Sequence, residues 1–120
     1  MQTQSNWYTV CKLDDLNTGA GVCALVNGQQ VAIFYLPKET PSLYAIDNFD
    51  PIGGANVLSR GIVGDVKGEL VVASPLYKDH FSLRTGRCLE QSIAVRVWPI
   101  QLSGDEVKVQ QPGAQIESAA

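Results

Sequence analysis

The chain has 120 residues with 9 basic and 12 acidic side chains, a net charge of −3, and a hydrophobic content of 45%. This length suits a single domain with a buried core, and the apolar stretches are far shorter than the roughly 20 residues that span a membrane. The basic residues are scattered singly, so no electrostatic footprint for nucleic acid is present. We therefore expect one domain that neither crosses a membrane nor binds nucleic acid.

The N-terminus and the cysteines predict a cytoplasmic protein. Residues Met1–Asn6 contain neither the basic region nor the apolar core of a secretory signal. The three cysteines, Cys11, Cys23 and Cys88, are odd in number and include no C-x-x-C pair, which favours reduced thiols over a disulfide framework. We expect all three to be small buried hydrophobes.

The periodicity along the chain is that of short strands. Strands are predicted at 22–26 and 31–35 around an Asn27-Gly28 turn, a strong hairpin signal. Another strand is predicted at 43–46, and short helical pieces at 12–16 and 55–59.

The second half of the chain continues the pattern with three further turns. Strands are predicted at 62–66 and 69–74 around Lys67-Gly68, at 81–83 and 88–89 around 84–87, and at 95–100 and 106–109 around 103–105. Many closely spaced strands predict an all-β sandwich or barrel. We assign residues 1–110 to this domain and predict that the polar segment 111–120 is a disordered tail.

Two segments, Ala45–Pro51 and Ser74–Phe81, resemble the two ligand loops of Rieske iron–sulfur domains. In those domains a C-x-H loop and a C-x-x-H loop bind a two-iron, two-sulfur cluster through two thiolates and two imidazoles. The second segment is followed by a short strand and a Thr85-Gly86 turn, as in the Rieske pattern, and the resemblance covers residues 5–110. It implies the Rieske-like (ISP) fold, in which stacked antiparallel sheets carry two loops, here vestigial.

The residues at the four ligand positions of this pattern are Asn48, Asp50, Ser74 and Tyr77. An amide, a carboxylate, a hydroxyl and a phenol cannot replace the thiolates and imidazoles that the cluster requires. We therefore predict that this chain binds no cluster. We also predict that the Tyr77 ring is buried and fills part of the cluster's space.

No residue pattern predicts catalysis on this chain. The only histidine, His80, falls on neither imidazole position, and the aspartates form no close carboxylate pair by spacing. The glycine-rich segment 52–55 lacks the lysine of a phosphate loop, and no hydrolase triad is recognisable. We predict neither catalytic nor metal-binding residues.

Within Rieske-like domains, the chain most resembles the small subunit of NAD(P)H-dependent nitrite reductase. The most diagnostic stretches are L-S-R-G-I-V-G-D at 58–65 and S-P-L-Y-K at 74–78. The resemblance implies a non-catalytic small subunit that supports the reduction of nitrite to ammonium in nitrogen assimilation. It also implies a large catalytic partner subunit that carries FAD, an iron–sulfur cluster and sirohaem.

Two other readings remain open at this point. One is a metal-free Rieske-like binding or structural module that associates with another oxidoreductase. The other is a ferredoxin-type electron carrier, which the missing ligands argue against.

The two vestigial loops are also the predicted contact surface for the large subunit, because loops on a rigid scaffold are common recognition sites. An apolar centre with a polar fringe is typical of interfaces. The alternative is that the same apolar residues pack on one another and close the empty site. The predicted contact residues are Phe49, Pro51, Ile52, Pro75, Leu76, Lys78, Asp79 and His80.

Overall fold

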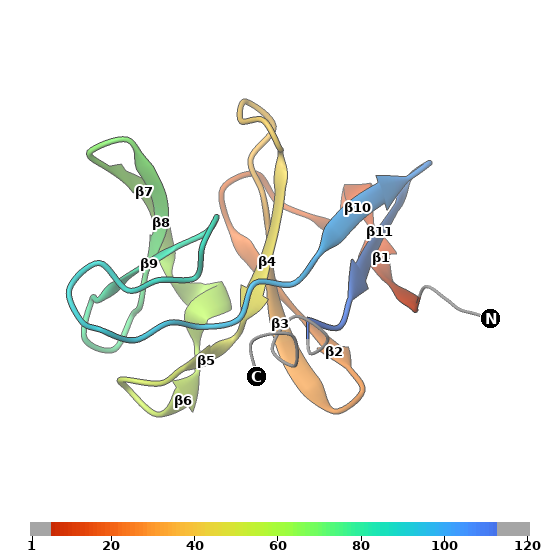
Figure 1. Ribbon diagram of the computed structural model, residues 1–120. Coiled ribbons are helices and arrows are strands. Elements are labelled where there is room, and N and C mark those ends of the chain that lie inside the picture. The colour runs from red at the N-terminus through yellow and green to blue at the C-terminus, as the bar shows by residue number, and fades with distance from the viewer. Residues whose placement is uncertain (1–5, 113–120) are drawn as a thin grey trace.

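The computed structural model describes residues 6–112, and its secondary structure is almost entirely antiparallel strands (Figure 1). Sheet A has the strand order β1-β11-β10, and its strands are β1 (Trp7–Lys12), β10 (Ile100–Ser103) and β11 (Glu106–Gln110). Sheet B has the order β2-β3-β4, with β2 (Gly21–Val26), β3 (Gln29–Tyr35) and β4 (Leu43–Asp47). Sheet C pairs β5 (Phe49–Asp50) with β6 (Ala55–Asn56), and sheet D has the order β7-β8-β9, with β7 (Ile62–Val66), β8 (Glu69–Ala73) and β9 (His80–Ser82). Two 3₁₀ turns lie between strands: η1 (Leu13–Asp15) follows β1, and η2 (Leu58–Arg60) follows β6.

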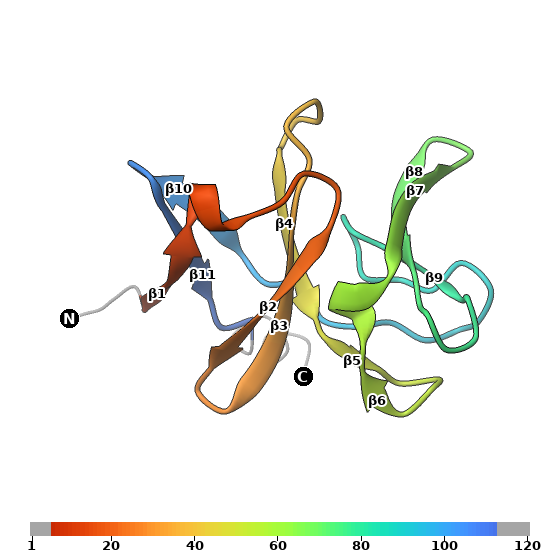
Figure 2. The same ribbon diagram turned by 180° about the vertical axis from the view of Figure 1, so that it is seen from behind.

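Sheet B lies in the middle of the molecule, with sheet A on one side and sheets C and D on the other (Figures 1 and 2). Successive side chains of a strand point to opposite faces, and strands β3 and β4 are apolar on both. Ala32, Phe34, Tyr44 and Ile46 pack in a cluster with Val72 and Phe81 of sheet D. The alternate residues Val31, Ile33, Leu43 and Ala45 pack in a second cluster with Trp98, Val107 and Val109. The predicted all-β fold of stacked antiparallel sheets is confirmed.

The turn chemistry explains the two best-predicted hairpins. Asn27 and Gly28 have φ values of 50° and 78°, and Lys67 and Gly68 have 52° and 88°. Two successive residues with positive φ form the turn whose twist matches paired strands, which is why Asn-Gly and related pairs are strong signals. The strands around these turns are β2–β3 and β7–β8, as predicted.

The strand predicted at 95–100 is wrong over most of its length. Regular pairing begins only at Ile100, and Pro99 has no N–H to donate to a ladder. The segment before it runs beside β4 instead: Asp47 N donates to Arg96 O (3.0 Å) and Trp98 N donates to Ala45 O (2.8 Å). It thereby links sheet D to sheet A.

Side chains fix this crossing segment in place. The Asp47 carboxylate accepts hydrogen bonds from Trp98 Nε1 at 2.9 Å and from Arg96 Nε at 3.0 Å. The Arg96 guanidinium also lies over the Trp98 ring, 5.6 Å from its centroid, a favourable cation–π arrangement.

Several smaller predictions also differ from the structure. Strands β1, β5 and β6 were not predicted. The predicted strand at 88–89 is only a single bridge between Phe81 and Cys88. Cys23 is exposed, although it was predicted to be buried. The helical piece at 12–16 corresponds to η1, whereas that at 55–59 is β6 followed by η2. Of the predicted tail, Pro112 is buried, and 113–120 lie outside the described residues. None of the helices in the described range is long and apolar enough to cross a membrane.

The two glycines of the 58–65 stretch provide a matched test of the β7–β8 packing. A Cβ on Gly61 would lie 2.4 Å from Ala73 O, whereas a Cβ on Gly64 would meet nothing within 4 Å. Overpacking against backbone that cannot move aside costs about 1–3 kcal/mol. We expect Gly61→Ala to lower the free energy of unfolding by that amount in urea denaturation, and Gly64→Ala to change it by less than about 0.5 kcal/mol. Equal effects of the two substitutions would contradict this packing.

Candidate functional site: the two vestigial loops

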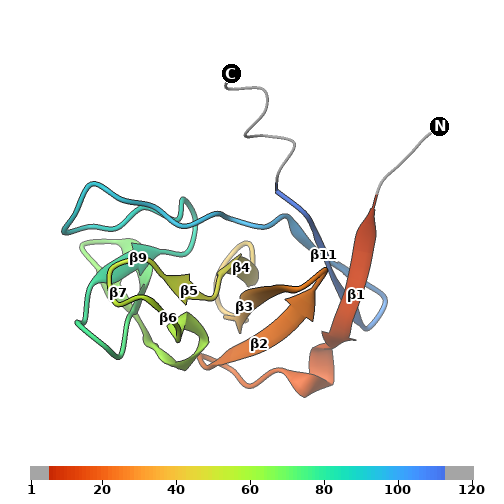
Figure 3. The ribbon, with the colours of Figure 1, turned by 90° about the horizontal axis from the view of Figure 1, so that it is seen from below.

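The two predicted loops lie together at the end of the molecule that carries sheets C and D (Figures 1 and 3). Asp50 is the last residue of β5, directly before the β5–β6 loop, and Ser74 is the first residue of the β8–β9 connection. Ser74 Oγ donates a hydrogen bond of 2.5 Å to Asp50 Oδ2. Two of the four predicted ligand positions are therefore in direct contact, and they bind each other.

Asp50 is the centre of this arrangement. Its side chain is 0% exposed, and its other oxygen, Oδ1, accepts hydrogen bonds from Ile52 N at 2.8 Å and Gly53 N at 3.0 Å. Three donors compensate the desolvation of a buried carboxylate, and hydrogen bonds to a charged acceptor are the stronger ones. The Asp50 carboxylate thus shapes its own loop and holds the second loop through Ser74.

Asn48, at the junction of β4 and β5, connects the site to sheet B. Its Oδ1 accepts a hydrogen bond from Ser59 N at 2.7 Å, and its Nδ2 donates to Gln30 Oε1 at 3.0 Å. A weaker contact joins Nδ2 to Cys23 Sγ at 3.6 Å. The amide is buried and its polar atoms are satisfied, so it ties η2 to strand β3.

Tyr77 is 68% exposed, so the prediction of a buried ring is wrong. The loop turns back on itself here: Lys78 has a positive φ of 66°, and Lys78 N donates to Ser74 O at 3.0 Å. This turn directs Leu76 toward the first loop, where a Cβ on Gly53 would lie 2.4 Å from Leu76 Cδ1. Leu76, rather than Tyr77, closes the space between the loops.

The four positions do not fit a two-iron, two-sulfur cluster. Its soft iron and sulfide require thiolate and imidazole donors, and these positions offer oxygen and amide groups. The oxygens of Asp50 and Asn48 and the Ser74 hydroxyl are already engaged within the protein. The Tyr77 phenol points to solvent.

The predicted contact residues divide by burial. Phe49 (46% exposed), Pro75, Leu76 and Lys78 are on the surface. Pro51 is half-buried, and Ile52 is half-buried and packs on the core cluster of sheet D. Asp79 is only 9% exposed, so its predicted place in the exposed fringe is wrong.

His80 is held by a residue that the sequence did not single out. Glu90 accepts a hydrogen bond from His80 N at 2.8 Å through Oε1, and its Oε2 lies 2.6 Å from His80 Nδ1. The hydrogen bond from His80 N, together with the His80 ring, lowers the pKa of Glu90. The hairpin predicted around the 84–87 turn could have revealed this pair. In an antiparallel register with Phe81 opposite Cys88, residues 79–80 lie near residues 89–90.

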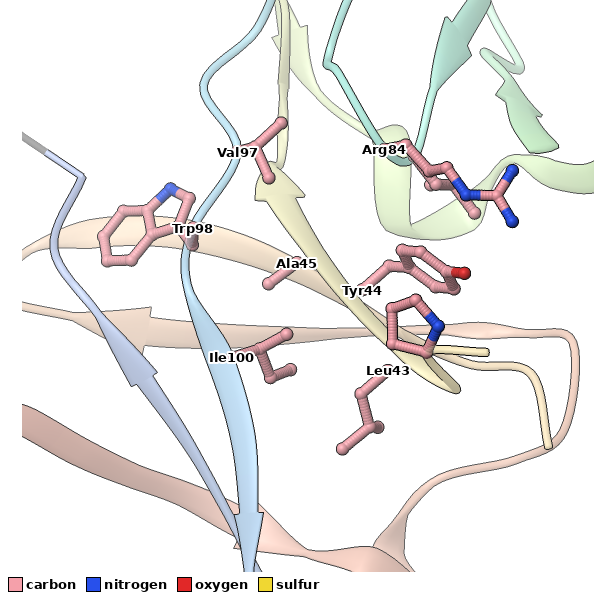
Figure 4. Close-up of a pocket in the computed structure, with 9 residues that line it drawn as sticks. Leu43, Tyr44, Ala45, Arg84, Val97, Trp98 and Ile100 are labelled. Atoms are coloured by element: carbon pink, nitrogen blue, oxygen red, sulfur yellow. The ribbon is translucent and has the colours of Figure 1, made fainter. Parts of the chain in front are cut away.

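A pocket over strand β4 is a second candidate (Figure 4). Leu43, Tyr44 and Ala45 line it from β4, Trp98 lies at one end, and Tyr44 and Arg84 lie at the other. The Tyr44 hydroxyl is buried and has no hydrogen-bond partner within residues 6–112. The pocket lining is mostly apolar and contains no base beside a nucleophile, so it offers no catalytic constellation.

Comparison with known proteins identifies the family. Residues 6–110 match the Rieske-like [2Fe-2S] domain family. The nitrite reductase (NADH) small subunit of Salmonella typhimurium is 51% identical over 86 residues, which are 72% of this chain and 79% of that protein. The chain belongs to the nitrite reductase small-subunit family.

A solved structure and a much longer protein are also similar to this chain. The solution structure of the nitrite reductase small subunit from Erwinia carotovora is 47% identical with a TM-score of 0.72, covering 88% of this chain and 81% of that one. The nitrite reductase large subunit of Klebsiella oxytoca is 42% identical over 104 residues, which are 86% of this chain but only 11% of that protein. A domain of this type therefore also occurs within a much longer chain.

The hydrogen bonds of Asp50 predict a graded effect of substitution. Asp50→Ala leaves Ser74 Oγ and the N–H groups of Ile52 and Gly53 without their acceptor, and each buried unsatisfied group costs about 1–3 kcal/mol. Asp50→Asn keeps the shape and one acceptor, so we expect a clearly smaller loss in chemical denaturation. Combining Asp50→Asn with Ser74→Ala should show a non-additive coupling. Additive effects would mean that the two loops are not joined by this bond.

The donor set also predicts how the protein behaves toward cluster components. Anaerobic incubation with iron and sulfide is expected to leave the protein without stoichiometric iron and without a visible charge-transfer spectrum, because Asn48, Asp50, Ser74 and Tyr77 provide no thiolate or imidazole. Absorption spectroscopy and iron analysis after gel filtration are the measurements. One bound two-iron cluster per chain would overturn this assignment.

Proposed function

We propose that this chain is the non-catalytic small subunit of a cytoplasmic NAD(P)H-dependent nitrite reductase, in which it supports the reduction of nitrite to ammonium for nitrogen assimilation. The identity to the Salmonella typhimurium small subunit is the observation that carries this proposal. The closed loops support it: Asp50 and Ser74 bind each other where a cluster-bearing domain has ligands. Electron transfer then belongs to the large subunit, with FAD, an iron–sulfur cluster and sirohaem as its expected cofactors.

The Klebsiella oxytoca relative supports a role beside the catalytic chain. There a segment similar to 86% of this chain is part of a protein named as the large subunit. A domain that is covalently part of the large subunit in one organism is a natural non-covalent partner of it in another, because tethering raises the effective concentration of a contact that already exists.

We further propose that the large subunit binds the tip surface, defined as Phe49, Pro75, Leu76, Tyr77 and Lys78. All five residues are exposed, and four of them are apolar or aromatic. Exposed aromatic side chains on rigid loops suit an interface, since aromatic anchors supply much of the binding energy. The hydrogen bonds of Asp50 beneath the tip fix these loops before binding, which reduces the entropy lost on association.

The direct test is assembly and activity with the purified large subunit. We expect this chain to co-purify with a sirohaem-containing protein and to increase its nitrite-dependent NAD(P)H oxidation or its thermal stability. Co-purification with a different oxidoreductase would instead support a metal-free binding module. A large subunit that neither binds the chain nor changes in activity or stability would refute the proposal.

Substitutions at the tip surface test the contact itself. Phe49→Ser combined with Tyr77→Ser is expected to weaken binding to the large subunit at least tenfold, measured by surface plasmon resonance, because interface aromatics often contribute about 2 kcal/mol or more each. Leu102→Ser is the matched control, since Leu102 is exposed to the same degree (45% against 46% for Phe49) but lies on sheet A. All variants should unfold within about 0.5 kcal/mol of the parent. If Leu102→Ser weakens binding and the tip variant does not, the contact lies on sheet A.

A further inference from the structure

The pocket over strand β4 is lined by the one residue in the range 6–112 that has a buried side-chain polar atom without a hydrogen-bond partner (Figure 4). That atom is the hydroxyl oxygen of Tyr44, a residue that is only 4% exposed. Buried polar groups are nearly always hydrogen-bonded, because an unsatisfied one destabilises the fold, so this exception requires a physical explanation. A residue that only filled the core would need the ring of Tyr44 and not its hydroxyl.

The pocket is large enough for a small organic molecule. Its volume is about 280 Å³, and an apolar cavity of about 150 Å³ already accommodates benzene. Leu43 and Ala45 line it from β4, and Trp98 and Ile100 line it from the segment that leaves β4 for sheet A. This lining favours a ligand with an apolar body, and the remaining volume leaves room for a short polar group.

The polar side chains of the pocket lie together at one end. In Figure 4 the Tyr44 hydroxyl and the Arg84 guanidinium point the same way, away from Trp98. Arg84 is the only charged residue of the described chain that lines this pocket. A hydroxyl and a guanidinium together form a donor set for an anionic oxygen group, and the planar guanidinium matches a carboxylate through two parallel N–H donors.

The Arg84 side chain is able to move toward a ligand. Its ionic partner is Glu39, with Arg84 Nη2 3.9 Å from Glu39 Oε1, and the two side chains are 39% and 40% exposed. An exposed pair of this kind contributes little stability. Because the Tyr44 hydroxyl is enclosed, a neighbouring side chain must shift before a ligand reaches it, and Arg84 is the long, exposed side chain of the lining.

The charge at this end of the pocket also limits the ligand. One guanidinium is present, and the Glu39 carboxylate lies beside it. A second carboxylate with a single negative charge can share this guanidinium or displace Glu39 from it. A phosphate dianion would leave negative charge uncompensated in a partly buried place, which is costly.

We propose that the pocket over β4 binds a small organic monocarboxylate with an apolar body of about the size of one ring. The ring contacts Leu43, Trp98 and Ile100, and the carboxylate accepts hydrogen bonds from the Tyr44 hydroxyl and the Arg84 guanidinium. The ligand thereby joins β4 to the segment that leads to sheet A. This site goes beyond the proposed function and is separate from the tip surface, so it binds its ligand in the isolated chain.

Phenylacetate is the probe for the first test, and benzyl alcohol is the matched neutral compound, with the same ring and no charge. We expect phenylacetate to raise the Tm of the full chain with a Kd of about 1 mM or tighter. Benzyl alcohol is expected to bind more weakly by about tenfold or more, because it cannot pair with Arg84. An unchanged Tm at about ten times that phenylacetate concentration, or equal affinity for the two compounds, would overturn the proposal.

Substitutions of the two polar residues provide the second test, measured by calorimetry with phenylacetate. Tyr44→Phe keeps the ring and removes the unsatisfied hydroxyl, so we expect an equal or higher Tm without ligand and an affinity lower by about fivefold or more. Arg84→Gln should lower the affinity by about tenfold or more. Arg87→Gln is the matched control, since Arg87 is exposed at the other end of the same turn and does not line the pocket. Parent-like affinity in Tyr44→Phe or Arg84→Gln, or equal losses in the two arginine variants, would exclude the proposed site.

Discussion

The hydrogen bond from Ser74 to Asp50 is the contact on which this end of the molecule depends. In a cluster-bearing Rieske domain each loop supplies ligands to the same irons, so the metal joins the loops. Here the Ser74 hydroxyl joins the loops by donating a hydrogen bond of 2.5 Å to the Asp50 carboxylate, which also accepts hydrogen bonds from two backbone N–H groups. The loops therefore keep their mutual arrangement through the protein's own polar groups.

This bond holds the loops together because the scaffold beneath it is rigid. Strands β3 and β4 are apolar on both faces, so sheet B is fixed by the cores on either side. Asn48 connects the loops to this rigid sheet. It directly follows β4, and its side chain forms hydrogen bonds with Ser59 N and Gln30 Oε1. The tip surface is thus a feature of the fold rather than of a flexible loop, which suits it to recognition.

The sequence predicted what local chemistry determines and missed what distant contacts determine. The Asn27-Gly28 and Lys67-Gly68 turns specify their hairpins through positive φ. Strand β1 was missed because it pairs with β11, nearly a hundred residues later in the chain. The direction of Tyr77 was mispredicted because it follows from the backbone conformation of Lys78, and the bond between Asp50 and Ser74 links loops that no short pattern relates.

Asp50 shows how a position that carries a cluster ligand in the Rieske pattern becomes purely structural. Its carboxylate accepts three hydrogen bonds and is completely enclosed, so its charge is compensated and no coordination position remains. Hydrogen bonds to a charged acceptor are the stronger ones, so the group that once would have been a ligand now stabilises the loop itself. The position equivalent to a cluster ligand is therefore closed.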